Sequence, residues 1–328
     1  MIAPRNREHV SQALTIRETL LEGRRLLETA PPLASIDTAA LDAALLLGEV
    51  LGKRRTDLLA HSDDPVSEAD GQRFLSLIQR RRGGECTAYI LGRKEFRALE
   101  FAVNPAVLVP RPDTETLVEA ALDFVDVRWR AGGGESGNSG NGISLLDLCT
   151  GSGAVAISLK NERRFLDVTA SDISPAALEM AALNARRLLG GGEAGGENGV
   201  RFIHSDLFKN IRGQFDIIVS NPPYITSSEM LTLPPEVRRE PPLALDGGDD
   251  GLALIRVIIS QAGEHLKPGG VLLLEAAPRQ MPAIRDLLAG SGLGSVEVRK
   301  DLAGRERVIA GWGGNSAYHN GEKVEMQI

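Results

Sequence analysis

The sequence predicts an α/β protein, in which a small all-helical domain precedes a mostly parallel, doubly wound sheet with one antiparallel edge strand. Three observations support this fold class. From residue 15 to about residue 82, apolar residues recur at helical spacing. From residue 143 to residue 288, short apolar runs alternate with amphipathic segments, as in a parallel sheet covered by helices. The last two strand-like segments, 296–299 and 307–310, are close enough for a hairpin, so one edge strand should be antiparallel.

The composition suits a soluble protein of two domains in a reducing compartment. The chain has 328 residues, more than one typical domain, and 42% of them are hydrophobic, enough for a sizeable core. The net charge of −7 argues against a surface built for a polyanion, so we expect no direct nucleic-acid partner. Cys86 and Cys149 lack metal or redox spacing and the histidines form no ligand motif, so we expect no metal site. No apolar run reaches the ~20 residues of a membrane span, which favours a cytoplasmic protein without a membrane partner.

Stop signals divide the helical part of the chain. Pro31-Pro32 ends the first helix, Gly52 ends a second, and Ser67 is a good N-cap for a helix that closes on the basic residues 80–82. We assign residues 1–85 to this domain. It is either a structural cap on the rest of the chain or a docking module for a macromolecular substrate. Docking is favoured, because a small substrate would not need the extra surface.

Strand patterns begin after the helical domain. Residues 86–108 are compatible with a linker that contains a hairpin, with its turn near Arg97-Ala98. Residues 109–314 form the second domain, and the polar residues 315–328 are expected to be disordered. Two glycine-rich segments within the second domain are interpreted as flexible loop insertions: 132–142 and 190–199.

The most informative stretch is 215–224, Phe-Asp-Ile-Ile-Val-Ser-Asn-Pro-Pro-Tyr. Residues 217–219 are typical of a buried strand, and the two prolines end it because proline has no N–H to donate. Asn221 therefore lies at the strand's carboxyl end, with its backbone held extended by Pro222. The Asn221 side-chain oxygen and the Pro222 carbonyl can accept both hydrogens of a planar –NH2 group, and Tyr224 adds a flat face for stacking. The alternative is structural: a proline pair that kinks the loop after a core strand.

A second feature lies upstream. Residues 147–153, Asp-Leu-Cys-Thr-Gly-Ser-Gly, predict a strand that runs into a glycine turn and a helix, and glycines let backbone approach a ligand closely. Asp172, after the next strand, can accept hydrogen bonds from ribose hydroxyls or can cap the following helix in competition with Ser174. Asp206, after the third strand, can address an adenine amino group or cap its loop. Ligands of open α/β sheets bind at the carboxyl ends of strands, so we expect these positions to share one crevice with Asn221.

These residues leave a choice of cofactor. Ala156 occupies the third position of the dinucleotide fingerprint, which tolerates alanine, so NAD stays possible. ATP is disfavoured because the turn has no Walker lysine. Two acceptors for an –NH2 group at Asn221 suit methyl transfer to a planar nitrogen better than hydride transfer, so S-adenosyl-L-methionine fits best. The loop at 109–119 is either an N-cap box or a cofactor-lining segment in which Arg111 supplies a cation.

Several motifs, taken in order, resemble one known family. The motifs are Val-Pro-Arg-Pro-Asp-Thr-Glu (109–115), Asp-Leu-Cys-Thr-Gly-Ser-Gly (147–153), Ser-Asp-Leu-Phe (205–208), Asn-Pro-Pro-Tyr-Ile (221–225), Glu-Pro-Pro-Leu-Ala-Leu (240–245), Asp-Gly-Leu (250–252) and Asp-Leu-Ala-Gly-Arg-Glu-Arg (301–307). From Tyr89 to Trp312 the chain resembles the HemK/PrmC family, the peptide chain release factor glutamine N5-methyltransferases. Asn-Pro-Pro-Tyr is shared with N6-adenine DNA methyltransferases, whereas Arg-Pro-Asp-Thr-Glu and Asp-Gly-Leu are more specific to the glutamine enzymes.

The resemblance implies a Rossmann-like class I methyltransferase domain joined by a β-hairpin to the helical domain. The implied reaction moves a methyl group from S-adenosyl-L-methionine to the glutamine side-chain nitrogen in the Gly-Gly-Gln loop of peptide chain release factors, which modulates translation termination. The implied cofactor loop is Cys149, Thr150, Gly151, Ser152 and Gly153. The resemblance also implies that Asp172 binds the ribose, that Leu207 lies beside the adenine and that Asn221 touches both cofactor and substrate. The implied substrate-binding residues are Asn221, Pro222, Pro223 and Tyr224.

The sequence departs from the family pattern at three positions. Cys86 stands where the family usually has proline, Cys149 replaces the more usual glycine, and Leu207 stands where some members carry tryptophan. Two alternatives stay open: an N6-adenine-type nucleic-acid methyltransferase, and a non-catalytic cofactor-binding scaffold that docks a partner through its helices. The intact Asn-Pro-Pro-Tyr motif argues against the scaffold. Since an amide nitrogen is a poor nucleophile, the mechanism we expect is catalysis by placement, with Asn221, Pro222 and Tyr224 as the catalytic residues.

Overall fold

The computed structural model describes residues 13–29, 36–131, 142–190 and 199–313, and the chain divides into two compact units. The first unit is the chain up to Leu91 together with Pro234–Arg239, and the second is the remainder. The expectations for the C-terminal tail and for most of the two glycine-rich segments lie outside the described residues. None of the helices in the described ranges is long and apolar enough to cross a membrane.

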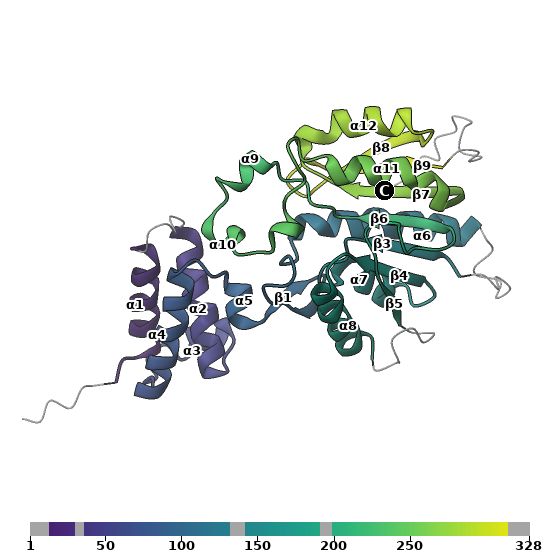
Figure 1. The fold of residues 1–328 in the computed structure, drawn as a ribbon. Helices are drawn as coiled ribbons and strands as arrows, with labels where there is room; N and C mark the ends of the chain where they lie inside the picture. Colours follow the sequence, from purple (N-terminus) through teal and green to yellow (C-terminus); the bar gives the residue numbers. More distant parts are fainter. Residues whose placement is uncertain (1–12, 30–35, 132–141, 191–198, 314–328) are drawn as a thin grey trace, which may run out of the picture. The chain divides into compact units, whose positions relative to one another are not determined.

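In its described residues, the first unit contains helices and no strand of the sheets (Figure 1, purple to blue, with α10 in green). Its helices are α1 Ile16–Glu28, α2 Ile36–Leu51, α3 Arg55–Ala60, α4 Glu68–Arg82, α5 Thr87–Leu91 and α10 Pro235–Arg238. Its core lies where α1, α2 and α4 meet, and Leu46, Phe74 and Ile78 are fully buried there. Polar residues fix the helix ends: Thr15 and Glu18 form a capping box on α1, and the Ser67 hydroxyl accepts from the Asp70 backbone N–H at 3.1 Å.

Helix α5 corrects one expectation from the sequence. Strand patterns were expected from Cys86 onward, but Thr87–Leu91 form a short helix, whose first turn is closed by the Ile90 backbone N–H donating to the Cys86 carbonyl at 3.1 Å. Ile90 is buried in the core of the first unit. Packing of this apolar residue against the helices therefore outweighs the strand preference of the local sequence.

The second unit begins with a hairpin of β1 Arg93–Phe96 and β2 Leu99–Ala102. Phe96 pairs with Leu99, so the turn consists of Arg97 and Ala98, where the sequence predicted it. Both turn residues have positive φ, 47° and 57°, which is the backbone of a two-residue hairpin turn. The Arg97 guanidinium, 2.7 Å from the Glu162 carboxylate, ties this turn to the end of helix α7 Ala154–Glu162.

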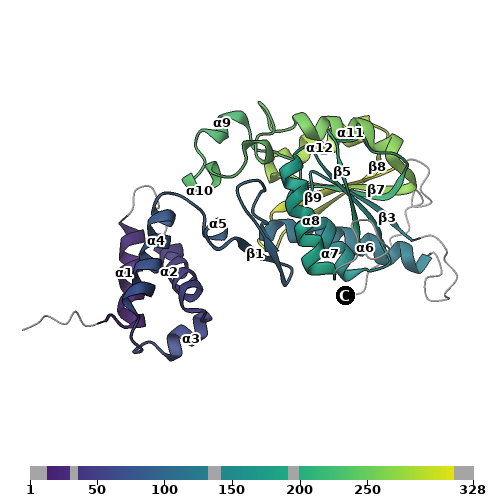
Figure 2. The same ribbon diagram turned by 60° about the horizontal axis from the view of Figure 1, so that its bottom comes forward.

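The second unit is built on a seven-stranded sheet whose order is β5-β4-β3-β6-β7-β9-β8 (Figures 1 and 2). The strands are β3 Ser144–Leu148, β4 Asp167–Asp172, β5 Val200–His204, β6 Phe215–Ser220, β7 Leu266–Glu275, β8 Gly294–Lys300 and β9 Glu306–Trp312. The helices are α6 Glu115–Ala131, α7 Ala154–Glu162, α8 Pro175–Leu189, α9 Ser227–Met230, α11 Ala253–His265 and α12 Met281–Gly290. Within the described residues, short 3-10 helices occur at Pro112–Thr114, Pro242–Ala244 and Pro278–Gln280.

The predicted fold class is confirmed. Strands β3 to β7 pair in parallel, whereas β9 runs antiparallel to both β7 and β8 at one edge of the sheet. Strand β7 begins at Leu266, which pairs with Phe215 at the start of β6, and the register between the two strands shifts between Phe215 and Ile217.

Both faces of the sheet are covered by helices. In the central strand β6, Ile217 and Val219 pack against the layer that contains α6 and α7, whereas Ile218 packs against the layer that contains α11 and α12. Successive side chains of a strand point to opposite faces, so a strand buried on both sides must be apolar throughout. This explains the continuous apolar run at 217–219, which the polar residues Asp216 and Ser220 of β6 flank.

Candidate functional site

The carboxyl ends of β3 and β6 meet where the chain order of the sheet reverses. Strand β3 pairs with β4 on one side and with β6 on the other, and Leu148 lies opposite Ser220 in the register. The next residues, Cys149 and Asn221, therefore leave the sheet side by side. In open α/β sheets, such a reversal creates a crevice in which ligands bind.

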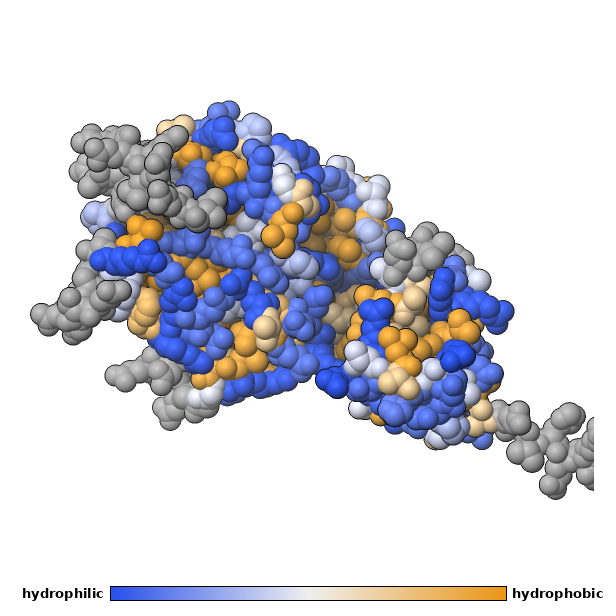
Figure 3. Space-filling model, turned by 180° about the vertical axis from the view of Figure 1, so that it is seen from behind, coloured by the Kyte–Doolittle hydropathy of each residue, from blue (hydrophilic) through white to orange (hydrophobic). Residues whose placement is uncertain are grey.

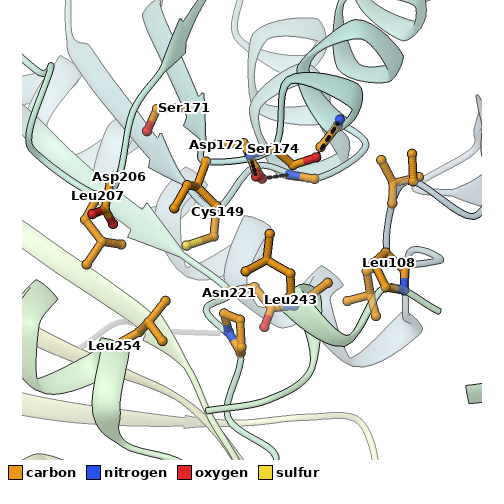
Figure 4. Close-up of a pocket in the computed structure, with 18 of the residues that line it drawn as sticks. Leu108, Cys149, Ser171, Asp172, Ser174, Asp206, Leu207, Asn221, Leu243 and Leu254 are labelled. Atoms are coloured by element: carbon orange, nitrogen blue, oxygen red, sulfur yellow. Dashed lines mark hydrogen bonds between the residues drawn. The ribbon is translucent and has the colours of Figure 1, made fainter. Parts of the chain in front are cut away.

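A pocket of about 280 Å³ occupies this crevice. Figure 4 shows Asn221 and Leu243 on the opposite side of the pocket from Asp172 and Ser174, with Cys149 between them. The wall is mostly apolar, with a few polar groups, as is usual for small-molecule sites. The lining residues are Ala106, Val107, Leu108, Cys149, Gly151, Ser171, Asp172, Ile173, Ser174, Ala177, Ser205, Asp206, Leu207, Asn221, Pro223, Pro241, Leu243, Ala244 and Leu254.

The glycine turn after β3 is stabilised by hydrogen bonds to the buried side chain of Asp147. The Asp147 carboxylate accepts hydrogen bonds from the Thr150 hydroxyl at 2.6 Å and from the Ala156 backbone N–H at 3.2 Å. Burial raises the pKa of Asp147 to about 7. Gly153 has a φ of 82°, and a Cβ at this position would lie 2.7 Å from Cδ1 of Ile157, so the turn requires glycine.

The predicted cofactor loop therefore divides into two sets. Cys149 and Gly151 reach the pocket wall, whereas Thr150, Ser152 and Gly153 lie behind it. The Thr150 and Ser152 side chains are buried, and the residues behind the wall shape the loop.

Asp172 connects two loops at the pocket wall. Its carboxylate accepts from the backbone N–H groups of Gly151 and Ser174, each at 2.9 Å. The hydroxyl of Ser174 accepts from the Ala177 backbone N–H at 3.2 Å and caps α8, so Ser174, and not Asp172, is the cap. Burial raises the pKa of Asp172 although these backbone donors oppose the shift. Asp172 is left facing the pocket with oxygens that can accept from hydroxyl groups.

Asp206 and Leu207 form the pocket wall after β5. The turn that carries them is closed by Ser205, whose hydroxyl donates to the Leu207 carbonyl at 2.6 Å and accepts from the Asn210 backbone N–H at 3.0 Å. Leu207 has a φ of 46°, in the left-handed region that bulky residues rarely adopt. Backbone strain of this kind clusters at ligand sites, which agrees with the place of Leu207 on the pocket wall.

The side chain of Asn221 is oriented by a hydrogen bond. Its Nδ2 group donates to the hydroxyl oxygen of Thr114 at 3.2 Å. Thr114 lies in the Arg-Pro-Asp-Thr-Glu segment, 107 positions earlier in the chain. Since the amide nitrogen is engaged there, the carbonyl oxygen of Asn221 lies on the opposite side of the amide group.

Two of the residues proposed for catalysis are away from the pocket wall. Pro222 is buried behind it, and the Tyr224 hydroxyl points to the carboxylate of Glu275 at 3.4 Å. The Tyr224 carbonyl accepts from Nε2 of Gln280 at 2.9 Å. Burial raises the pKa of the Tyr224 hydroxyl above its usual range, so this group stays protonated.

Arg111 forms an ion pair with another segment and is not among the residues that line the pocket. Its guanidinium pairs with Glu240, whose side chain is 1% exposed. The same carboxylate accepts from the Val109 backbone N–H at 3.0 Å. The pair joins the segment before α6 to the segment that supplies Pro241 and Leu243 to the pocket.

Sequence reasoning overlooked two residues beside the motif. Thr114 was interpreted only as a helix cap, and Glu275 was not considered. Glu275 ends the buried strand β7, so the rule that selected Asp172 and Asp206, a carboxylate at the carboxyl end of a strand, could have found it.

Comparison with known protein families matches both parts of the chain. Residues 18–92 match the PrmC N-terminal domain, and residues 138–233 match the methyltransferase small domain. The hMettl16 catalytic domain in complex with the MAT2A 3'UTR hairpin 6 superposes with a TM-score of 0.50, covering 75% of this chain and 82% of that one. At 13% identity, this similarity concerns the fold alone.

Curated relatives extend over most of the chain. The release factor glutamine methyltransferase of Burkholderia pseudomallei is 43% identical over 277 residues, which span 83% of this chain and 91% of the relative. The enzyme of the same name from Moorella thermoacetica is 38% identical, and the match spans 90% of this chain and 97% of the relative. The family resemblance seen in the motifs is thereby confirmed. The chain belongs to the release factor glutamine methyltransferase family.

Proposed function

We propose that this protein transfers a methyl group from S-adenosyl-L-methionine to the side-chain amide nitrogen of the glutamine in the Gly-Gly-Gln loop of peptide chain release factors. The observation that carries the proposal is the position of Asn221, at the mouth of a pocket between β3 and β6, in a chain of this family. Neither Cys86 nor Cys149 forms a disulfide, which agrees with a reducing, cytoplasmic compartment.

The residues around the pocket fit the proposed cofactor. Asp172 offers carboxylate oxygens to the ribose hydroxyls, and Asp206 can accept from the adenine amino group, beside the apolar side chain of Leu207. The Gly151 backbone allows close approach at the centre of the wall. S-adenosyl-L-methionine supplies, when bound, an electrophilic methyl group on a sulfonium.

The contribution of this chain to the reaction is placement. The Asn221 side-chain oxygen and the Pro222 carbonyl accept the two N–H groups of the substrate amide and hold its nitrogen toward the cofactor pocket. The same oxygens stabilise the positive charge that develops on that nitrogen, which gains the methyl group and loses one of its two protons to water. Burial raises the pKa of the Cys149 thiol to about 12, so this pocket residue is neither a base nor a nucleophile at neutral pH.

The helical unit is the proposed docking module for the release factor. Hydrophobic side chains occur on its surface (Figure 3), and its exposed leucines include Leu21, Leu41, Leu45 and Leu59. Exposed apolar groups of this kind are a common feature of protein interaction sites. A helical docking unit also explains how the enzyme could choose one loop of a large substrate.

Methyl transfer to release factor tests the proposed function directly. We expect labelled S-adenosyl-L-methionine to label a release factor, and a release factor in which the glutamine of Gly-Gly-Gln is replaced by alanine to stay unlabelled. Labelling of duplex or single-stranded DNA instead would assign the chain to the adenine-type enzymes. Cofactor binding without transfer to either substrate would favour the scaffold.

Substitution of Asn221 tests the proposed catalytic residue. Asn221→Ala removes one of the two acceptors, so we expect the single-turnover rate at saturating cofactor to fall by about 100-fold or more while the melting temperature stays close to wild type. Asn221→Asp keeps an acceptor but loses the donor to Thr114, and it reports whether oxygen geometry alone suffices. An unchanged rate for Asn221→Ala would exclude this residue from catalysis.

A further inference from the structure

Three side chains from separate segments lie near one another beside the pocket. Asn221 follows β6, Thr114 ends the 3-10 helix before α6, and Glu275 ends β7. Nδ2 of Asn221 donates to the Thr114 hydroxyl oxygen at 3.2 Å. The Thr114 hydroxyl also acts on the Glu275 carboxyl group, where it opposes the rise in pKa that burial causes. Thr114 and Glu275 are only 5% and 1% exposed, so water does not compete for their polar groups.

The direction of hydrogen-bond donation among these three side chains follows from their chemistry. An amide NH2 group can only donate, so the Thr114 oxygen must accept from Asn221. The single hydroxyl hydrogen of Thr114 is not used in that bond, and the Glu275 carboxyl group near it accepts when it is ionised. Burial raises the pKa of Glu275 to about 7, so donation from Asn221 through Thr114 to Glu275 applies to the ionised form that prevails above that pH. With ionised Glu275 as the final acceptor, the Asn221 amide group has one orientation, with its nitrogen toward Thr114 and its oxygen away from it.

Orientation matters because the two ends of an amide group have nearly the same shape and opposite hydrogen-bonding character. A flipped Asn221 would present NH2 to the NH2 of the substrate, and two donors repel. The proposed contact to substrate therefore needs a device that prevents the flip. Packing alone cannot provide it, since both orientations fill the same space.

Glu275 occupies a costly position for a carboxylate. It is buried at the end of a strand, and its Oε2 atom has no hydrogen-bond partner among the described residues. An unsatisfied buried polar group costs about 1–3 kcal/mol, and such exceptions call for an explanation. The charged groups around it are Arg307, which attracts it, and Asp113, which repels it, with the Tyr224 hydroxyl at 3.4 Å. A protein with an apolar residue at this position would be more stable, so the presence of a carboxylate indicates a role other than stability.

We propose that Thr114 and Glu275 are positioning residues for methyl transfer: Glu275 orients the Thr114 hydroxyl, and the hydroxyl holds Asn221 with its oxygen toward the substrate amide. This inference rests on the proposed function of Asn221. Neither residue touches substrate or cofactor. Both act through the orientation of one amide group.

A matched pair of substitutions at residue 114 tests the proposal. Thr114→Val keeps the shape and removes the hydroxyl, whereas Thr114→Ser keeps the hydroxyl and removes a methyl group. We expect Thr114→Val to lower the single-turnover rate at saturating release factor by about 10-fold to 100-fold, with cofactor affinity unchanged, and Thr114→Ser to stay within about threefold of wild type. Equal losses in the two variants, or no loss in Thr114→Val, would overturn the hydrogen-bond role.

A double-mutant cycle separates positioning from general structural support. If Thr114 acts through Asn221, then Thr114→Val should have no further effect on the single-turnover rate in an Asn221→Ala background. Should Thr114→Val reduce the rate by the same factor in both backgrounds, it acts independently of Asn221 and the proposal fails. The cycle assumes activity of the wild-type protein on release factor, and absence of that activity would instead reject the proposed function.

Glu275→Gln extends the test if Thr114→Val does not fold. Glutamine has the same shape as glutamate but offers an NH2 group as well as an oxygen, so it no longer forces the Thr114 hydroxyl to donate away from Asn221. We expect a lower single-turnover rate with an unchanged cofactor dissociation constant, and no further loss in the Asn221→Ala background. A wild-type rate in Glu275→Gln would show that the carboxylate does not orient the Thr114 hydroxyl.

Discussion

Cys149 shows how a single backbone angle constrains the pocket. It lies where β3 ends, with a φ of 60°, in the left-handed region where most family members are expected to carry glycine. A side chain in this conformation costs roughly 1–2 kcal/mol, because Cβ approaches the following carbonyl oxygen. The residue turns the chain away from the sheet and opens the crevice beside Asn221.

Strain at Cys149 can be measured with two substitutions. Alanine keeps Cβ and its strain, whereas glycine removes both. We expect the free energy of unfolding of Cys149→Gly to be about 1 kcal/mol higher than that of Cys149→Ala. At most positions the alanine variant is the more stable of the two. Urea unfolding of both variants measures the difference. A Gly variant less stable than the Ala variant would show that the position is unstrained.

Single residues also show how far sequence reasoning extends. Asp172, Asp206, Leu207 and Asn221 follow the carboxyl ends of strands, and that rule alone brings them to one pocket. It does not predict the direction of Tyr224, because neighbouring residues in an extended segment point to opposite sides. The hydroxyl of Tyr224 is directed to Glu275, 51 positions later in the chain. Such a partner is fixed by the assembled sheet and not by local sequence.

At the scale of the element, glycines in helices have unequal roles. Gly23 lies in α1, where an added Cβ would come within 2.4 Å of Cζ of Phe74, so α1 and α4 approach closely there. Gly71 lies in α4 with nothing within 4 Å of an added Cβ. Helix propensity favours alanine at both positions, and packing opposes it at only one.

This difference predicts opposite effects of one substitution. Gly71→Ala should raise the free energy of unfolding by up to about 1 kcal/mol, and Gly23→Ala should lower it by about 1–3 kcal/mol, because the added methyl overpacks the core. Thermal unfolding of the two variants is sufficient to compare them. A stabilised Gly23→Ala variant would mean that the helices move apart at no cost.

Two strands carry carboxyl groups that make stability depend on pH. Burial raises the pKa of Asp147 in β3 from 3.8 to about 7, and that of Glu275 in β7 from 4.5 to about 7. Between about pH 5 and pH 7 the folded chain therefore binds more protons than the unfolded chain. The stabilisation from these groups is complete below their unfolded pKa values and is lost as pH rises through 7.

We therefore expect the free energy of unfolding to fall as pH rises from about 5.5 to 8, by at most about 1.4 kcal/mol per pH unit for each group. Asp147→Asn should reduce this slope, since asparagine does not titrate. Asp286→Asn, at an exposed position on α12, is the control and should leave the slope unchanged. Equal slopes in wild type and Asp147→Asn would contradict the assignment to Asp147.

At the scale of the whole molecule, the sequence predicted the helical part, the hairpin and the sheet in their order along the chain. Periodicity and stop signals are local, so they reveal elements reliably. The affiliation of Pro234–Arg239 with the helical unit could not be predicted. That segment follows the Asn-Pro-Pro-Tyr motif in sequence, and Arg239 is bound there by a hydrogen bond to the carbonyl of Gly83. Contacts between residues so distant in sequence leave no periodic signal.

The proposed docking role of the helical unit predicts a specific kinetic defect. Leu41 and Leu45 lie one turn apart on α2 and are both 40% exposed. Replacing both with glutamine should raise KM for intact release factor by about fivefold or more, roughly 1 kcal/mol, and leave the rate at saturation unchanged. Leu183→Gln on α8, where the leucine is 37% exposed, is the control. An unchanged KM in the double variant would place docking elsewhere.

The hydrogen bond that engages the nitrogen of Asn221 has a consequence for how many times one glutamine is modified. A primary carboxamide carries two hydrogens, and the proposed corner has one oxygen for each. After one methyl transfer the nitrogen carries a single hydrogen. In a second round, the methyl carbon would collide with the oxygen that had accepted the hydrogen it replaced. The substrate site formed by the two oxygens should therefore bind the methylated product poorly. Mass spectrometry of exhaustively treated release factor should show monomethylglutamine with no dimethylated form.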